Sequence, residues 1–319
     1  MHKRKKFRNL LALLLAVAVL TNTFTVLPAR AEEETVTLYV NSLNGNDESE
    51  GTAEAPYKTL DAAITAVDGK EADHRIVKIV GEYQWTSVAE HTNPITIEGN
   101  TGSDTDSLTV NQANVNVNGP LTIDNITIDF SATTGDCSIA ARGYDLVLGK
   151  GVKVEEGKNG PDLITGFYNP SDEDGTEKRH SITVQGGSWR RVFLGDSVIN
   201  SARDLREVRG VDFTLDGGSV EDIRIGSNGW GGYYGACSYA GNVNVTINGG
   251  TITNTNTNGG VRLVDLSANP DWNAGTDKKM DFNGNAVQIL FNNGTGEGIP
   301  VPDAEKMKEL DGELYVLKC

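Results

Sequence analysis

Aromatic side chains recur in a part of the sequence that is rich in Gly and Asn, and they could recognise a sugar. An exposed aromatic ring offers a flat apolar surface that can stack on the apolar face of a pyranose. The alternative is that these rings pack their own segments onto the rest of the fold. The predicted sugar-stacking residues are Trp230, Tyr233, Tyr234, Tyr239 and Trp272.

Arginines are concentrated in a neighbouring segment, although the chain as a whole is acidic. Arg203, Arg206 and Arg209 follow closely after the pair Arg190 and Arg191. A guanidinium can bind a sugar carboxylate through two parallel hydrogen bonds. The sequence therefore predicts that Arg203, Arg206 and Arg209 contribute to glycan binding. The alternative is that they form ion pairs on a solvated loop.

Acidic clusters could supply oxygen ligands to calcium, which prefers carboxylate and carbonyl oxygens. Asp172, Glu173 and Asp174 form one such cluster, and the polar stretch 44–48 forms another. Neither is a complete calcium loop of the EF-hand type, so a solvated acidic turn is the alternative. Calcium is the only cofactor that the sequence suggests.

Carboxylates could also carry out hydrolysis, which needs two of them facing a scissile bond at a defined separation. Asp196, Asp216 and Asp222 stand near the predicted corners of the fold. Related segments have Gln185 and Asn248 at the position of Asp216, which predicts a hydrogen-bonding turn there. No catalytic pair can be assigned from the sequence, so the catalytic residues stay unknown.

The charge of the chain disfavours two classes of partner. It has 28 Lys and Arg against 44 Asp and Glu, a net charge of −16. Six of the basic residues lie at positions 1–31, which hold no acid, so the remainder carries a charge of −22. Such a surface disfavours nucleic acid and anionic lipid. It also weighs against acidic polysaccharides, unless calcium or the Arg203–Arg209 segment makes a local exception.

The amino-terminal segment 1–31 has the pattern of an export signal. A basic segment at positions 3–8 precedes an apolar run at positions 10–20, which is too short to span a bilayer. The tripeptide at 29–31 (Ala-Arg-Ala) matches the small residues at a cleavage site. The sequence therefore predicts a secreted or cell-surface protein with no membrane insertion after cleavage; an uncleaved anchor helix is the alternative.

An internal repeat predicts the architecture. Segments 182–189 (ITVQGGSW), 213–220 (FTLDGGSV) and 245–252 (VTINGGTI) align without gaps, and their starts are almost evenly spaced along the chain. Each unit is too small to bury its apolar face alone, so successive units must stack. The pattern predicts an all-β fold, a parallel β-helix. An antiparallel sandwich would not explain the recurring octapeptide.

Longer spacing in the second half of the chain predicts insertions at one position in each coil. They are expected at residues 155–180, 196–210, 226–242 and 265–285, each after the second strand of its unit. Insertions at one phase of a stacked solenoid lie along one side. This side is the predicted binding face, because binding residues tend to lie on loops above a rigid scaffold.

A short helix is expected near the amino terminus, with apolar residues at 60, 63, 64 and 67 and Thr59 as its N-cap. Together with segments 38–41 (LYVN) and 55–64 (APYKTLDAAI), it resembles the entry of secreted right-handed parallel β-helix proteins of the pectate-lyase-like superfamily. The resemblance implies a right-handed β-helix capped by this helix. It leaves activity open, because the superfamily includes lyases, hydrolases, epimerases and non-catalytic surface proteins. The Gly-Gly-Ser/Thr repeats also resemble exported surface proteins of Gram-positive bacteria.

The expected organisation is a signal peptide (1–31), an N-terminal strand and cap helix (32–70), β-helix coils (71–298) and a C-terminal segment (299–319) that could lead into a further region. The expected function is an extracellular or cell-surface module that binds glycan or serves as an adhesin-like structural element, without catalysis. Its partner would be a polysaccharide or a cell-wall or matrix glycan. The alternative is a polysaccharide-active enzyme, a lyase or glycoside hydrolase, with its groove on the loop-bearing face.

Overall fold

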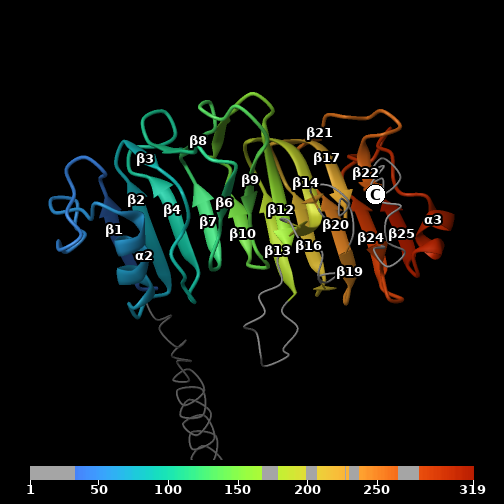
Figure 1. Ribbon diagram of the computed structural model, residues 1–319, viewed down its shortest axis with the longest axis horizontal. Helices are drawn as coiled ribbons and strands as arrows, with labels where there is room; N and C mark the ends of the chain where they lie inside the picture. The colour runs from blue at the N-terminus through green and yellow to red at the C-terminus, as the bar shows by residue number, and fades with distance from the viewer. Residues whose placement is uncertain (1–32, 167–178, 199–206, 227, 230–236, 265–279) are drawn as a thin grey trace, which may run out of the picture. The chain divides into compact units, whose positions relative to one another are not determined.

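The computed structural model describes residues 33–166, 179–198, 207–226, 228–229, 237–264 and 280–319. Within residues 35–319, the described strands pair in parallel with one another. The largest sheet has ten strands, which lie side by side in chain order (Figure 1). They are β1 (Thr35–Val40), β2 (His74–Ile79), β4 (Ile95–Gly99), β7 (Leu121–Asp124), β10 (Leu146–Leu148), β13 (His180–Val184), β16 (Val211–Leu215), β20 (Val243–Ile247), β24 (Ala286–Phe291) and β25 (Glu313–Lys318).

Among the described residues, three further parallel sheets complete the coils. The eight-stranded sheet contains β6 (Asn114–Asn116), β9 (Cys137–Ala140), β12 (Pro161–Gly166), β14 (Ser188–Val198), β17 (Ser219–Ile225), β18 (Asn228–Gly229), β21 (Thr251–Ile252) and β22 (Gly260–Leu263). A four-stranded sheet contains β3 (Glu82–Gln84), β5 (Ser107–Thr109), β8 (Thr127–Asp129) and β11 (Lys153–Glu155). A three-stranded sheet contains β15 (Glu207–Val208), β19 (Cys237–Tyr239) and β23 (Met280–Asp281).

The strand register explains the repeat in the sequence. Ile182 of β13 pairs with Phe213 of β16, which pairs in turn with Val245 of β20, so the first residues of the three octapeptides are stacked. Alternate residues of these strands are buried, as a period of two requires. The predicted parallel β-helix is confirmed.

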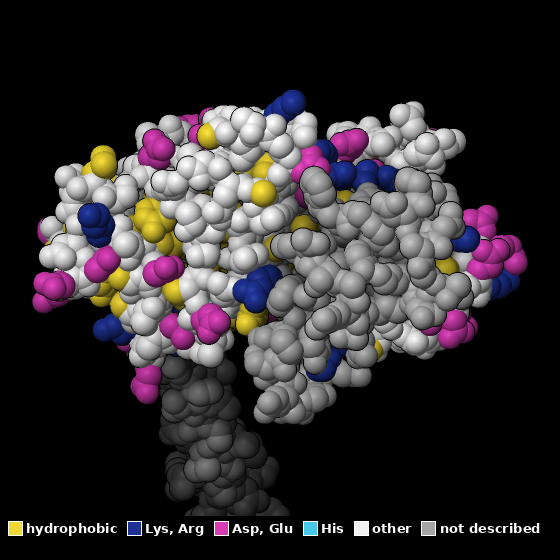
Figure 2. Space-filling model, in the orientation of Figure 1, with side chains coloured by type: hydrophobic (Ala, Val, Ile, Leu, Met, Phe, Trp, Pro, Cys, Tyr) yellow, Lys and Arg dark blue, Asp and Glu magenta, His cyan; other side chains and the backbone are white. Residues whose placement is uncertain are grey.

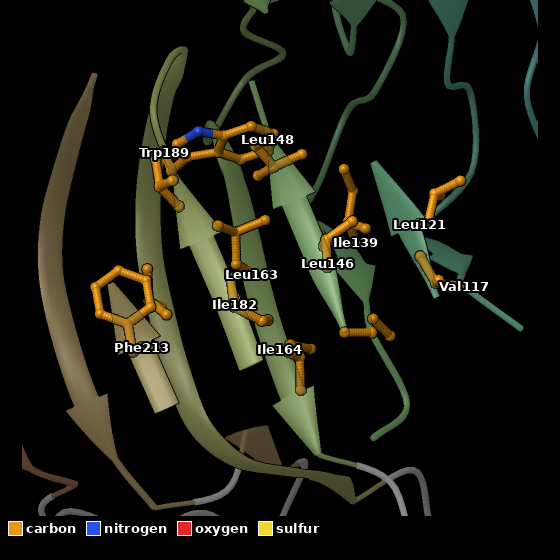
Figure 3. Packing of buried hydrophobic residues seen from close by; sticks show 14 of the residues in the cluster. Val117, Leu121, Ile139, Leu146, Leu148, Leu163, Ile164, Ile182, Trp189 and Phe213 are labelled. Atoms are coloured by element: carbon orange, nitrogen blue, oxygen red, sulfur yellow. The ribbon is translucent and has the colours of Figure 1, made fainter. Parts of the chain in front are cut away.

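The core lies between the ten-stranded and the eight-stranded sheets. Figure 3 shows Leu146 and Ile182 of the former lying close to Leu163 and Ile164 of the latter, with Trp189 beside Leu148. All these side chains are at most 2% exposed. Stacking therefore buries one continuous apolar interior that no single coil could form.

The Gly-Gly turn of each repeat is required by close contact between coils. A Cβ atom on Gly217 would lie 2.4 Å from the carbonyl oxygen of Gln185 in the preceding coil. The following Gly218 has a φ of +68°, a left-handed conformation that favours glycine. The first glycine of the pair therefore leaves room for the neighbouring backbone, and the second turns the chain.

We predict that Gly217→Ala lowers the free energy of unfolding by about 2 kcal/mol, because the added methyl group can be accommodated only if the backbone of the coil shifts. Urea-induced unfolding measures the change. Gly135→Ala is the control, since a Cβ there meets nothing within 4 Å and its φ is not left-handed. Equal stability of the two variants would contradict this explanation of the repeat.

The predicted cap helix is also confirmed, as α2 (Leu60–Asp68). Thr59 is its N-cap and accepts a hydrogen bond from the backbone N–H of Ala62. Asp47, from the polar stretch considered above for calcium, accepts hydrogen bonds from the backbone N–H groups of Lys58 and Thr59. Its carboxylate therefore fixes the entry to the helix. A second helix, α3 (Ala304–Glu309), precedes β25.

The predicted bounds of the insertions were wrong, and so was their expected place after the second strand in three of the four coils. The segments outside the described residues fall between β12 and β13, between β14 and β15, between β18 and β19, and between β22 and β23. Strand β12 lies inside the first predicted insertion, and the three-stranded sheet is built from residues of the other three. The prediction assumed two strands per coil, and these extra strands were hidden because they are short or lack the repeat motif.

Candidate binding surface

Charged side chains lie between buried apolar ones on four strands of the eight-stranded sheet, β12, β14, β17 and β22. Leu163 of β12 pairs with Val192 of β14, and both are fully buried. One residue earlier on β14, Arg191 pairs with Asp222 of β17 and belongs to the opposite, outer face. We call the charged group on this face the arginine–aspartate cluster. Its members are Arg190, Arg191, Arg224, Arg262, Asp136, Asp162 and Asp222.

One half of the cluster is organised around Asp162, whose side chain is 2% exposed. Arg190 donates to it from Nε and Nη2 over 2.9 and 2.8 Å, and Arg191 donates from the same two atoms over 2.9 and 2.5 Å. Arg190 also donates from Nη1 to Asp136 over 2.9 Å. Asp162 is thus held between two guanidinium groups.

Hydrogen bonding in this half favours the charged forms. Burial opposes the charge of Arg190, but its hydrogen bonds to Asp162 and Asp136 outweigh burial and raise the pKa of its guanidinium. The hydrogen bond from Arg190 likewise lowers the pKa of Asp136 below its usual value, against the opposing effect of burial. Both groups therefore stay ionised across the physiological pH range.

The other half is organised around Asp222, whose side chain is 1% exposed. Arg224 donates from Nε to Oδ1 over 2.7 Å and from Nη2 to Oδ2 over 3.0 Å. Arg262 of β22 donates from Nε and Nη2 to Oδ2, each over 3.3 Å. Asp222 had been a candidate for hydrolysis, and it lies here as a second carboxylate shared by two arginines.

The buried ring of Phe193 joins the two halves. The guanidinium carbon of Arg191 lies 5.3 Å from the ring centre, and that of Arg224 lies 5.4 Å from it. Both distances are within the range of a cation–π interaction. The ring and the two buried carboxylates together hold these guanidiniums in place, so they are organised before any ligand arrives.

The cluster reaches the surface through its four arginines and through Asp136. The arginine side chains are 11–24% exposed and that of Asp136 is 55% exposed, whereas Asp162 and Asp222 are almost completely covered. Figure 2 shows Lys and Arg side chains gathered over the part of the molecule that Figure 1 labels β17 and β22. Four partly exposed guanidiniums outnumber the one exposed carboxylate, that of Asp136, so the accessible part of the cluster has a net positive charge in an otherwise acidic protein.

Tyr239 does not have the exposed ring that sugar stacking requires, which corrects the prediction for this residue. It is fully buried, it stacks on Phe282 at a centroid distance of 4.8 Å, and its hydroxyl donates to the carbonyl of Leu194 over 2.5 Å. Its strand β19 pairs with β15, where Tyr239 is opposite the buried Val208. Tyr239 therefore belongs to the core.

The remaining predicted residues have mixed outcomes. Arg209 is half-buried between β15 and β16, outside the eight-stranded sheet that carries the arginine–aspartate cluster. The others lie outside the residues that the structure describes: Trp230, Tyr233, Tyr234, Trp272, Arg203, Arg206, Asp172, Glu173 and Asp174. The same holds for the side chain of Asp196.

Asp216 has the structural role that its position in the repeat predicts. Its Oδ1 accepts a hydrogen bond of 2.8 Å from Nδ2 of Asn248 in the next coil. Oδ1 of Asn248 accepts one of 2.7 Å from Asn292 in the coil after that. The three residues form a hydrogen-bonded ladder along the turns.

Sequence reasoning did not identify Asp162, Phe193, Arg224 or Arg262 as site residues. One signal was present, because Arg191 and Asp222 occupy the same position of two aligned repeats. Opposite charges at one repeat position face each other when the coils stack in register. The contribution of β22 could not be found in this way, because β22 lies outside the aligned octapeptides.

In the described part of the chain no group of His, Cys, Asp or Glu is arranged to hold a metal ion, and no helix has the length and apolarity needed to cross a membrane. Fold and register define the class as a parallel β-solenoid. Neither a protein-family model, nor a curated protein, nor a solved structure matches the chain.

Proposed function

We propose that the chain is an exported β-solenoid module that works outside the cell or at its surface, where it binds glycan without cleaving it. Export is supported by the basic and apolar segments within positions 1–31 and by the small residues that end them. The resemblance of the amino-terminal entry to secreted β-helix proteins of the pectate-lyase-like superfamily supports the same compartment. Fold alone does not assign the function, so the proposal depends on the surface.

The observation that carries the proposal is the arginine–aspartate cluster. Its guanidiniums are fixed on regular strands, and the segments outside the described residues each follow a strand of the same sheet. Planar guanidinium donors suit the oxygen-rich edge of a sugar. Binding groups on a rigid scaffold lose little conformational entropy when a ligand is bound.

The same cluster favours binding over catalysis. A general acid or base must have an oxygen within hydrogen-bond reach of the reacting group. The oxygens of Asp162 and Asp222 already accept hydrogen bonds from two arginines each, and both carboxylates are buried. They support the arginines and are poorly placed to exchange a proton with a substrate.

Incubation with a panel of neutral and acidic glycans, with and without calcium, tests the proposal. We expect at least one glycan to retain the protein, with no new reducing ends and no absorbance from unsaturated uronate. Product formation would establish the alternative, a lyase or glycoside hydrolase. Retention on none of the glycans would contradict glycan binding and leave a structural role.

A further inference from the structure

The charge that the arginine–aspartate cluster presents to a ligand differs from that of the whole chain. Four arginines are bound to three aspartates, so the cluster has one excess positive charge. The two carboxylates at its centre are 2% and 1% exposed. A ligand that approaches this face therefore meets four guanidinium groups and one exposed carboxylate, that of Asp136, which is 55% exposed.

Two of these guanidiniums retain donors on the side away from their carboxylates. Arg191 and Arg262 each use Nε and Nη2 to bind a buried aspartate. Within the described residues, no hydrogen bond involves Nη1 of either one. A guanidinium has five N–H donors in a planar fork, so binding one carboxylate leaves donors for a second oxyanion.

We propose that the arginine–aspartate cluster binds the oxyanion groups of an acidic glycan, through Arg191 and Arg262 on either side of the Phe193–Arg224 pair. The group recognised is a uronic acid carboxylate or a sulfate ester, since both match the guanidinium fork. This inference rests on the proposed function and adds the class of glycan. It reverses the expectation from the net charge of −22, because a local group of fixed cations dominates at contact distance, where long-range repulsion is screened by salt.

The shared carboxylates allow the arginines to be tested one at a time. Arg191→Gln leaves Asp162 bound to Arg190, and Arg262→Gln leaves Asp222 bound to Arg224. Each buried carboxylate therefore keeps one partner, and thermal unfolding checks that the variants fold. Arg179→Gln is the control, because it removes the same charge from an ion pair with Asp212 on the ten-stranded sheet.

The measurement is calorimetric titration with an oligogalacturonate, a sulfated oligosaccharide and an uncharged oligosaccharide of the same length. We expect one of the two acidic ligands to bind at least tenfold more tightly than the uncharged one. We expect Arg191→Gln and Arg262→Gln each to weaken that binding about tenfold, the effect of losing a charge-assisted hydrogen bond. Arg179→Gln is expected to bind like the unmodified chain. The two acidic ligands distinguish a carboxylate site from a sulfate site.

Three results would overturn the inference: equal affinity for the uncharged ligand, no effect of either arginine variant, or an equal loss in Arg179→Gln. Binding of the uncharged ligand alone would reject the acidic glycan and leave the proposed function standing. Binding of none of the three, with no retention on the wider glycan panel, would reject both.

Discussion

Asp222→Asn is expected to lower the free energy of unfolding by about 4 kcal/mol, because it leaves Arg224 and Arg262 without their shared carboxylate. The Arg224 side chain is only 11% exposed, so water cannot fully replace the lost partner. Chemical unfolding of the variant measures the change in stability. We also expect weaker binding of acidic glycan, because the two guanidiniums lose the group that orients them.

Asp216→Asn provides the matched control. It makes the same substitution on the same repeat, at an exposed turn where the side chain forms one hydrogen bond of 2.8 Å with Asn248. An asparagine oxygen can accept that bond, so we expect a change within about 0.5 kcal/mol. If Asp222→Asn were as stable as Asp216→Asn, the cluster would not be a buried, mutually dependent network.

Acid is expected to destabilise the solenoid through His180, which is 5% exposed at the start of β13. Burial lowers its pKa from 6.5 to about 4, and its Nε2 has no hydrogen-bond partner in the described structure. The unfolded chain binds a proton below pH 6.5, whereas the folded chain does so only below about pH 4. Stability is therefore lost as the pH falls from about 6.5 to about 4, by about 3 kcal/mol in total.

The neighbouring Asp212 does not contribute to the loss of stability between about pH 6.5 and about pH 4. The ion pair with Arg179 lowers the pKa of Asp212, so the stability that Asp212 contributes is lost only below its usual pKa of 3.8. Unfolding midpoints measured between pH 7 and pH 4.5 should therefore fall in the unmodified chain and stay nearly constant in His180→Leu. His74→Leu, at an exposed position, is the control, and its unfolding midpoint should decrease with pH as that of the unmodified chain does. A fall that persists in His180→Leu would assign the acid sensitivity to another group.

Much of the fold could be predicted because it depends on short-range patterns. The octapeptide beginning at Ile182 recurs at the coil interval, and the strand register places its copies on one another. Thr59 and the apolar spacing of residues 60–67 were enough for the cap helix. The third strand of each coil escaped detection because β12 and β15 carry neither the Gly-Gly turn nor a long alternation.

The candidate site was harder to predict because it depends on pairings between distant residues. Asp162 and Arg191 are 29 positions apart, and their contact depends on the register of β12 against β14. Tyr239 was misassigned for a related reason: its surroundings in the sequence are rich in Gly and Tyr, but β19 places the ring in the core. Local composition predicts which segments could bind a ligand, whereas only the register shows which side chains meet.

We propose that this solenoid holds an acidic glycan at the arginine–aspartate cluster without cleaving it. The most direct test is to incubate a soluble acidic glycan with the protein at concentrations where most of the glycan is bound, and then to compare its chain-length distribution before and after. We predict a bound glycan of unchanged length with no unsaturated ends. Shortened chains, or a glycan that never binds, would contradict the claim.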